Sequence, residues 1–140
     1  MAERFVNTTK SEGDAISNLA DRTLELQQFA YTVDTDGGTI ALTAAQFING
    51  ILHITGGTTS TVTTPTAAQI VAALTNAQIG SAFEFVIING GSGTADLQAG
   101  ASVSFTNQTD PTTGKTQLYK GIVTAVTTPA VRLVGLGGLI

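Results

Sequence analysis

Short apolar runs alternate with turn residues along most of the chain, and this pattern predicts a β-rich body over residues 37–140. The clearest strand is expected over residues 81–89, where Phe83, Phe85 and Ile87 share one face. Shorter strands are expected at residues 29–33, 39–42, 51–55, 58–63, 95–98, 102–106, 117–120, 122–127 and 131–134. Many short strands with turns between them predict a mainly β fold, a β-sandwich or jelly-roll-like domain with one or two short helices.

Two short helices are expected in the body. The sequence TAAQ at residues 43–46 has the spacing of a capping box, which predicts a single helical turn. Thr64-Pro65 places a good N-cap before a proline at the first helical position, which predicts a helix over residues 65–74. TAAQ occurs again at residues 66–69, although four residues are too few to establish an internal repeat.

The two ends of the chain differ from the body. Residues 1–36 are expected to form a charged N-terminal arm and helix: residues 1–10 have little periodicity, whereas the apolar spacing over residues 11–26 suits one helical face. The alternative for residues 1–20 is a disordered tail. Residues 135–140 are apolar and rich in glycine, and we expect them to be flexible.

Charge is concentrated at the N-terminal end. Ten of the sixteen ionic residues lie in residues 1–36, and the six in residues 37–140 sum to zero. A free monomer usually keeps about 25–35 % of its surface charged, so this neutral body with its abundant threonine is expected to face other subunits. The alternative is that threonine, serine and asparagine keep the body soluble unaided.

Composition excludes several kinds of chemistry. The chain has no cysteine and one histidine, which rules out disulfides, thiolate zinc sites and any metal site built on two imidazoles of one chain. A net charge of −4 argues against nucleic acid as a partner. No apolar run has the length of a membrane span, and the N-terminus shows no signal-peptide pattern. We therefore expect no cofactor and no nucleic-acid or membrane partner.

Candidate catalytic groups are few. His53 lies in an apolar run and is expected to point away from the core together with Ile51, with no nucleophile or carboxylate at a recognisable spacing. Asp34 and Asp36 match the start of a calcium loop, but the later ligand positions hold no oxygen-bearing side chain, so a solvated turn is expected.

Other site patterns are equally incomplete. The glycine-rich residues 90–93 follow a strand but are not followed by a Lys-Ser or Lys-Thr step, so no phosphate-binding loop is expected. The paired-carboxylate candidates are Asp34 with Asp36 and distant pairs such as Glu84 with Asp96, and the chain has few aromatic residues for the cleft that glycoside hydrolysis usually needs. We expect that the protein is not an enzyme.

Residues 39–136 carry a series of small and apolar residues with no chemical motif. Its elements are Leu42–Gln46, PTAAQIVAAL, Gly80-Ser81 with Phe83-Glu84-Phe85, Asn89-Gly90, Leu97 with Ala99-Gly100, and Val126-Thr127 with Pro129-Ala130-Val131. This series resembles small virion proteins of tailed bacteriophages, especially marine and cyanobacterial phages. The resemblance implies a non-enzymatic β domain on the particle, either a capsid decoration (cement) protein, often a trimer, or a part of the tail or its fibres.

The function expected from these observations is capsid decoration. The protein would be made in the host cytoplasm, form a homotrimer, and bind the major capsid protein on the outer surface of the virion head. The N-terminal arm is expected to make this contact through Arg4, Phe5, Val6, Ile16 and Leu19. One alternative is a tail-fibre or tail-spike module that binds a host-surface glycan, although the chain has only two tyrosines and no tryptophan for sugar stacking. A small hydrolase has the weakest support.

Overall fold

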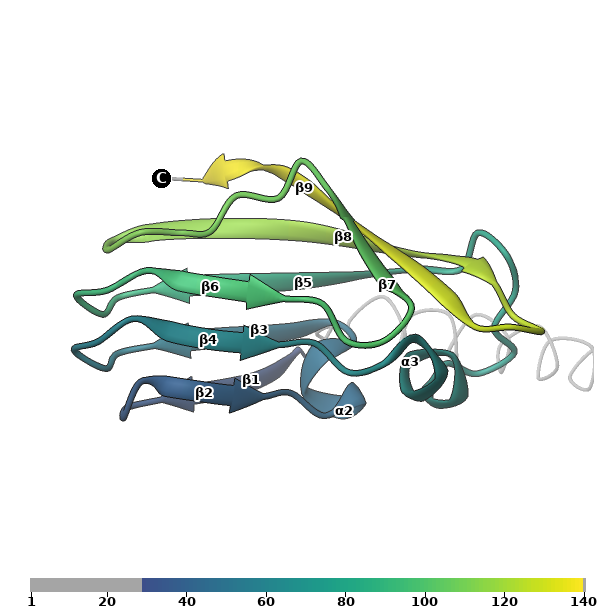
Figure 1. The fold of residues 1–140 in the computed structure, drawn as a ribbon, viewed down its shortest axis with the longest axis horizontal. Helices are drawn as coiled ribbons and strands as arrows, with labels where there is room; N and C mark the ends of the chain where they lie inside the picture. Colours follow the sequence, from purple (N-terminus) through teal and green to yellow (C-terminus); the bar gives the residue numbers. More distant parts are fainter. Residues whose placement is uncertain (1–28, 140) are drawn as a thin grey trace, which may run out of the picture.

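Two β-sheets and two short helices make up residues 29–139, the part of the chain that the computed structural model describes (Figure 1). In this part, six strands form one sheet in the order β1-β3-β5-β8-β9-β7, and three strands form the other in the order β2-β4-β6. The strands are β1 (Ala30–Asp34), β2 (Gly38–Ala41), β3 (Gly50–Ile54), β4 (Ser60–Thr63), β5 (Ala82–Asn89), β6 (Ala95–Gln98), β7 (Val103–Thr106), β8 (Lys115–Ala125) and β9 (Ala130–Leu139). The helices are α2 (Ala44–Phe47) and α3 (Ala67–Ala73). The prediction of a mainly β fold with one or two short helices is confirmed.

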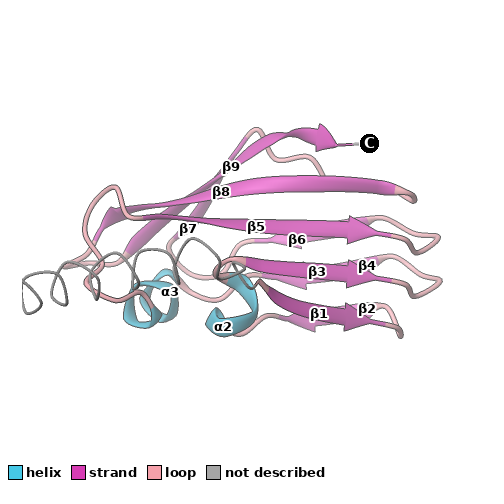
Figure 2. Ribbon diagram, turned by 180° about the vertical axis from the view of Figure 1, so that it is seen from behind, coloured by secondary structure: helices cyan, strands magenta, loops and turns pink. Residues whose placement is uncertain are grey.

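The strands β1 to β6 form a stack of three strand–turn–strand arches. In each arch the first strand (β1, β3 or β5) lies in the six-stranded sheet, and the second (β2, β4 or β6) lies in the three-stranded sheet (Figures 1 and 2). Neighbouring arches run parallel: Leu52 of β3 pairs with Thr32 of β1 on one side and with Ile87 of β5 on the other. Each arch therefore repeats the path of the previous one.

Glycines allow the turns of neighbouring arches to touch. A side chain at Gly56 would place its Cβ 2.7 Å from the backbone nitrogen of Gly37, and one at Gly91 would collide with the carbonyl oxygen of Gly56. Gly37 also has a φ of 72°, in the region that favours glycine. The glycine-rich segment 90–93 is thus the turn of the third arch, packed on the turn of the second.

The helices occupy equivalent places in the first two arches, because α2 follows β2 and α3 follows β4. Each begins with a complete capping box: Thr43 with Gln46 in α2, and Thr66 with Gln69 in α3. The two TAAQ sequences are therefore one local structure used twice, which four residues alone could not establish.

The predicted start of the second helix needs a correction. Its N-cap is Thr66 and not Thr64, since the Oγ1 of Thr66 accepts the backbone N–H of Gln69 at 3.2 Å. The Oγ1 of Thr64 accepts the backbone N–H of Gly100 at 2.9 Å and donates to the carbonyl of Pro65 at 3.0 Å. Thr64 thus connects the chain before α3 to the turn after β6, a long-range contact that a local capping rule does not predict.

The strands β7, β8 and β9 extend the larger sheet beyond the arches. β8 pairs antiparallel with β5, β9 pairs antiparallel with β8, and β7 pairs parallel with β9. The glycine at position 121 predicted a break in the strand, but β8 continues through it, and Gly121 pairs with Phe83 of β5 and Leu133 of β9. A glycine is needed there because the ring of Phe83 occupies the place where a side chain would lie. Residues 135–139, expected to be flexible, continue β9.

The core lies between the two sheets, and its centre is aromatic. Phe47 from α2 packs against Phe83 and Phe85, with ring centroids 5.4 and 4.7 Å apart, and Phe85 stacks near Tyr119 at 6.4 Å. Phe83, Phe85 and Ile87 all point into this core, as the alternation in that strand predicted. The helix α2 thereby closes one end of the space between the sheets.

The finer prediction of a β-sandwich or jelly roll is not confirmed. Jelly rolls are built from antiparallel strands, whereas the three arches pair only in parallel. Hydrophobic alternation shows which side of a strand is buried, but it is the same in parallel and antiparallel strands and therefore does not predict strand direction. In addition, β1 belongs to the six-stranded sheet, so the sheet takes in the end of the predicted N-terminal unit of residues 1–36.

Candidate interaction surface

The outward face of the six-stranded sheet is apolar. Tyr31, Ile51, Val86 and Leu118 form one row across β1, β3, β5 and β8, because the strand register pairs each with the next. A second row contains Val33, His53, Ile88 and Thr116. We define the apolar face as Tyr31, Val33, Ile51, Val86, Ile88, Leu118, Ile122 and Val134. This face is the main candidate for an interaction surface.

Exposure supports this assignment. Tyr31 and Val33 are 58 % and 48 % exposed, which is high for large apolar side chains on a sheet. The other members of the apolar face are half-buried by their neighbours within the sheet. Figure 2 shows the molecule with the six-stranded sheet toward the viewer, and both of the labelled helices lie at one end of the sheets.

Few charges interrupt the apolar face. Glu84 of β5 and Lys120 of β8 stand opposite each other in the register, and their Oε1 and Nζ atoms are 3.4 Å apart. Both side chains are partly exposed, at 42 % and 41 % respectively, so the pair contributes little stability and serves to neutralise the two charges. Arg132, on β9, adds one positive charge toward the far side of the sheet.

His53 lies on the apolar face with Ile51, as the sequence predicted, while Leu52 and Ile54 on either side of it are buried. Its Nδ1 is 2.7 Å from the hydroxyl oxygen of Tyr31, and the two rings are 6.1 Å apart. This hydrogen bond fixes the histidine ring against the edge strand. Residues 29–139 contain no cluster of three or more His, Cys, Asp or Glu side chains that could hold a metal ion.

The three-stranded sheet presents a different outward face. Thr39, Thr61 and Asp96 form one row across β2, β4 and β6, and Ala41, Thr63 and Gln98 form the next. Three of these six residues are threonines and only Ala41 is apolar, so this face is polar. The outward faces of the two sheets therefore differ: the face on the three-stranded sheet is polar, and the face on the six-stranded sheet is apolar.

The two ends of the arch stack are also unlike each other. The outer edge of β6 is capped by a loop, since the backbone N–H of Leu97 donates to Asp110 Oδ1 at 3.1 Å and its carbonyl accepts from Gln108 Nε2 at 2.6 Å. At the other end of the stack, β1 and β2 are edge strands that pair on one side only among the strands of the described region. Open strand edges of this kind are usually covered by another segment or subunit.

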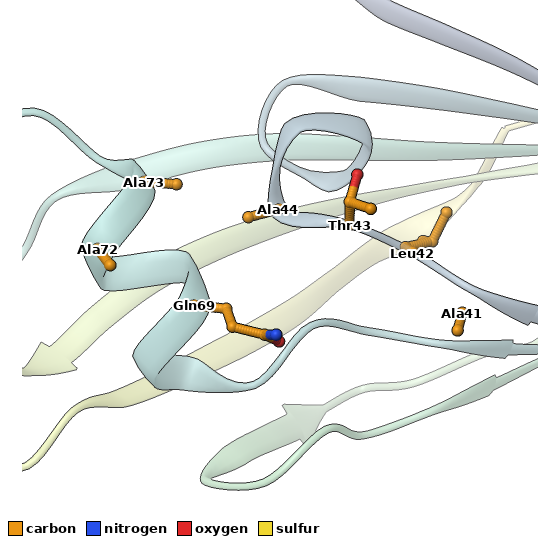
Figure 3. Close-up of a pocket in the computed structure, with 7 residues that line it drawn as sticks. All are labelled: Ala41, Leu42, Thr43, Ala44, Gln69, Ala72 and Ala73. Atoms are coloured by element: carbon orange, nitrogen blue, oxygen red, sulfur yellow. The ribbon is translucent and has the colours of Figure 1, made fainter.

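A shallow groove of about 610 Å³ lies between α2 and α3 (Figure 3). Its lining residues are Ala41, Leu42, Thr43, Ala44, Gln69, Ala72 and Ala73. Both polar side chains already belong to capping boxes, in which Thr43 accepts from Gln46 and Gln69 accepts from Thr66. No titratable side chain lines this groove, so it offers no group for acid–base or nucleophilic chemistry.

The carboxylates considered in the sequence do not assemble into a site. Asp34 Oδ2 accepts the backbone N–H of Gly37 at 3.0 Å and thereby closes the turn between β1 and β2, as expected for a turn. Glu84 and Asp96 lie on different sheets, and Glu84 pairs with Lys120. The arm residues Arg4, Phe5, Val6, Ile16 and Leu19 and the predicted helix over residues 11–26 lie outside the described residues.

Sequence reasoning missed the apolar face, although the signal was present in the strand 81–89. Val86 and Ile88 are apolar on the face opposite Phe85 and Ile87. A strand that is apolar on both faces is typical of burial on both sides. The core accounts for only one side, and the other side belongs to the apolar face.

Comparisons of the chain with protein-family models, curated proteins and solved structures gave no match. Within residues 29–139, no helix is long and apolar enough to cross a membrane.

Proposed function

We propose that the chain is a structural protein of a tailed-phage virion, namely a capsid decoration (cement) protein on the outer surface of the head. It binds the major capsid protein, forms a homotrimer and stabilises the shell through contacts between its subunits. It acts without catalysis or a cofactor, and without nucleic-acid or membrane contacts. In this proposal the two facing sheets serve as a sandwich-like body and the N-terminal segment serves as the attachment arm.

The observation that carries the proposal is the apolar face. Side chains such as Tyr31 and Val33, at 58 % and 48 % exposure, extend a continuous apolar surface over several strands. Contiguous apolar surface of this kind marks sites of protein–protein contact. An assembly of many copies would cover such faces, whereas a free monomer would leave them in water.

The charged N-terminal segment supports the attachment half of the proposal. An arm that orders when it binds can connect neighbouring subunits, and many weak attachments then add up to strong retention on the particle. Arg4 supplies a positive charge, and Phe5, Val6, Ile16 and Leu19 supply apolar anchors. Many bound copies would resist the outward pressure of the packaged genome.

A capsid-binding measurement tests this proposal. Purified full-length chain is mixed with expanded, undecorated heads of a tailed phage, the heads are pelleted, and the bound fraction is weighed. The double variant Phe5→Ser, Leu19→Ser should bind at least about tenfold more weakly. The control Thr8→Ala, Thr9→Ala changes the same segment without removing an anchor and should bind like the wild type.

The possible outcomes separate the hypotheses. If the full-length chain does not bind heads but binds host cells, the tail-fibre or tail-spike alternative replaces the decoration proposal. If the double variant binds heads as well as the wild type, the assignment of the arm is wrong. Circular dichroism and thermal unfolding of each variant show whether the folded body is unchanged.

A further inference from the structure

We propose that the apolar face binds a second copy of this chain. The inference deepens the proposed function and rests on it for the assembly in which the copies meet, but its test needs no capsid. In this arrangement the apolar face of one copy packs against the apolar face of a neighbouring copy, so that each face covers the other.

The charge distribution favours a second copy over a charged partner. The central row Ile51, Val86 and Leu118 is uncharged, and Glu84 and Lys120 already neutralise each other at 3.4 Å. Two such faces can therefore meet without strong repulsion between like charges. The face offers few charged side chains with which a strongly acidic or basic partner could form ion pairs.

The size of the face also fits self-association. The strands that carry the apolar face (β1, β3, β5, β8 and β9) have 5, 5, 8, 11 and 10 residues. Since strands lie about 4.8 Å apart and rise about 3.3 Å per residue, together they present roughly 600 Å². Two such faces bury about 1,200 Å² in total, which is at the lower limit for a specific protein contact.

The position of the face on the molecule points the same way. The edge strand β1 carries Tyr31 and Val33, which are the two most exposed members of the apolar face. The threonine-rich outward face of the other sheet leaves a surface that suits contact with water. One side of each copy would therefore face its neighbours, and the opposite side would face solvent.

Cysteine labelling tests the inference directly, because the full-length chain contains no cysteine. Val33→Cys places one thiol on the apolar face, and the control Thr39→Cys places one on the exposed face of the other edge strand, β2. A second pair uses Leu118→Cys and Thr61→Cys, which are both half-buried and lie in the interiors of their sheets. Labelling rates with a soluble thiol reagent are measured in concentrated solution and at high dilution, alongside the mass in solution.

If a second copy covers the face, Val33→Cys should react at least about tenfold more slowly than Thr39→Cys in concentrated solution, and dilution should remove the difference as the oligomer dissociates. The Leu118→Cys and Thr61→Cys pair should behave in the same way. The measured mass should fall from that of an oligomer to that of a single copy over the same range.

Two results would overturn the inference. Slow labelling of Val33→Cys at every concentration, with a monomeric mass, would assign the cover to another part of the same chain. Fast labelling at every concentration would show that the face is open in solution. If the chain binds capsids but labels fast at every concentration, the proposed function stands and only this inference fails. If the chain forms the concentration-dependent oligomer but does not bind capsids, this inference stands and the proposed function fails.

Discussion

Asn89 holds the third arch in place, and its replacement by alanine gives a sharp prediction about stability. The side chain is 2 % exposed, and its Nδ2 donates to the carbonyls of Gly93 and Pro111 at 2.7 and 2.8 Å. Its Oδ1 accepts the backbone N–H of Gly91 at 3.1 Å. At about 1 kcal/mol for each lost hydrogen bond, Asn89→Ala should lower the free energy of unfolding by about 3 kcal/mol. That is a large part of the roughly 5–15 kcal/mol expected for a domain of this size.

Urea denaturation at neutral pH measures this loss as a lower midpoint at an unchanged slope. The control is Gln98→Ala, which changes an exposed side chain and should stay within about 0.5 kcal/mol of the wild type. A loss below about 1 kcal/mol for Asn89→Ala would show that the three hydrogen bonds do not hold the arch, and would refute the reasoning.

The variant Asn89→Asp sharpens the same test. It keeps the acceptor for Gly91 but points a carboxylate oxygen at two carbonyl oxygens, so burial and these carbonyls should raise the pKa of the new carboxyl in the folded state. Its stability should therefore be highest below the unfolded pKa of about 3.9 and should decrease as the pH rises above it. At pH 7 we expect Asn89→Asp to be less stable than Asn89→Ala, and the opposite order would contradict the hydrogen-bond assignment.

Three further predictions concern the core and the helices. Burial, with a smaller effect of the nearby Asp110 carboxylate, raises the pKa of Tyr119 far above its usual value. Stability should thus fall by up to about 1.4 kcal/mol per pH unit above pH 10, where only the unfolded tyrosine ionises, and Tyr119→Phe should remove this part of the slope in urea titrations. Gly121→Ala should cost about 1–3 kcal/mol in thermal unfolding, because its Cβ collides with the core ring packed over it; a wild-type Tm would show that the ring can move away. Thr43→Ala and Thr66→Ala should each cost about 1 kcal/mol in urea denaturation, and a clear inequality would argue against equivalent capping boxes.

Local features of the fold were readable from the sequence. Alternation placed Phe83, Phe85 and Ile87 in the core, and the TAAQ spacing located the start of α2. These predictions succeeded because side-chain alternation and capping depend on neighbours only a few residues away. The same local logic placed His53 and Ile51 on the outward face of their strand.

The stacking of the arches could not be read in the same way. Parallel pairing of β1, β3 and β5 depends on contacts between residues far apart in the chain, and two of the connections contain helices that differ in length. The glycines in the turns could be read from the sequence, but the close contact of Gly56 with the turn of the preceding arch could not be predicted from it. Similarly, Gly121 looked like a strand end, because the ring that covers it comes from a distant strand.

The candidate site was only partly predictable for a related reason. The low charge of the body indicated that some surface needs neighbours, but composition cannot say which surface. Only the register that aligns Ile51, Val86 and Leu118 shows that the apolar residues form one continuous face. Threonine does not distinguish the two sheets, because the strands of the three-stranded sheet hold three threonines (Thr39, Thr61 and Thr63) and those of the six-stranded sheet hold four (Thr32, Thr106, Thr116 and Thr124).

An image of the assembled virus particle at a resolution that traces the chain tests the central claim most directly. The account predicts copies of the protein on the outer surface of the head, with Val33 and Leu118 of each copy against the apolar face of a neighbouring copy. Copies located in the tail, or copies on the head whose six-stranded sheets face water on their outward side, would contradict it.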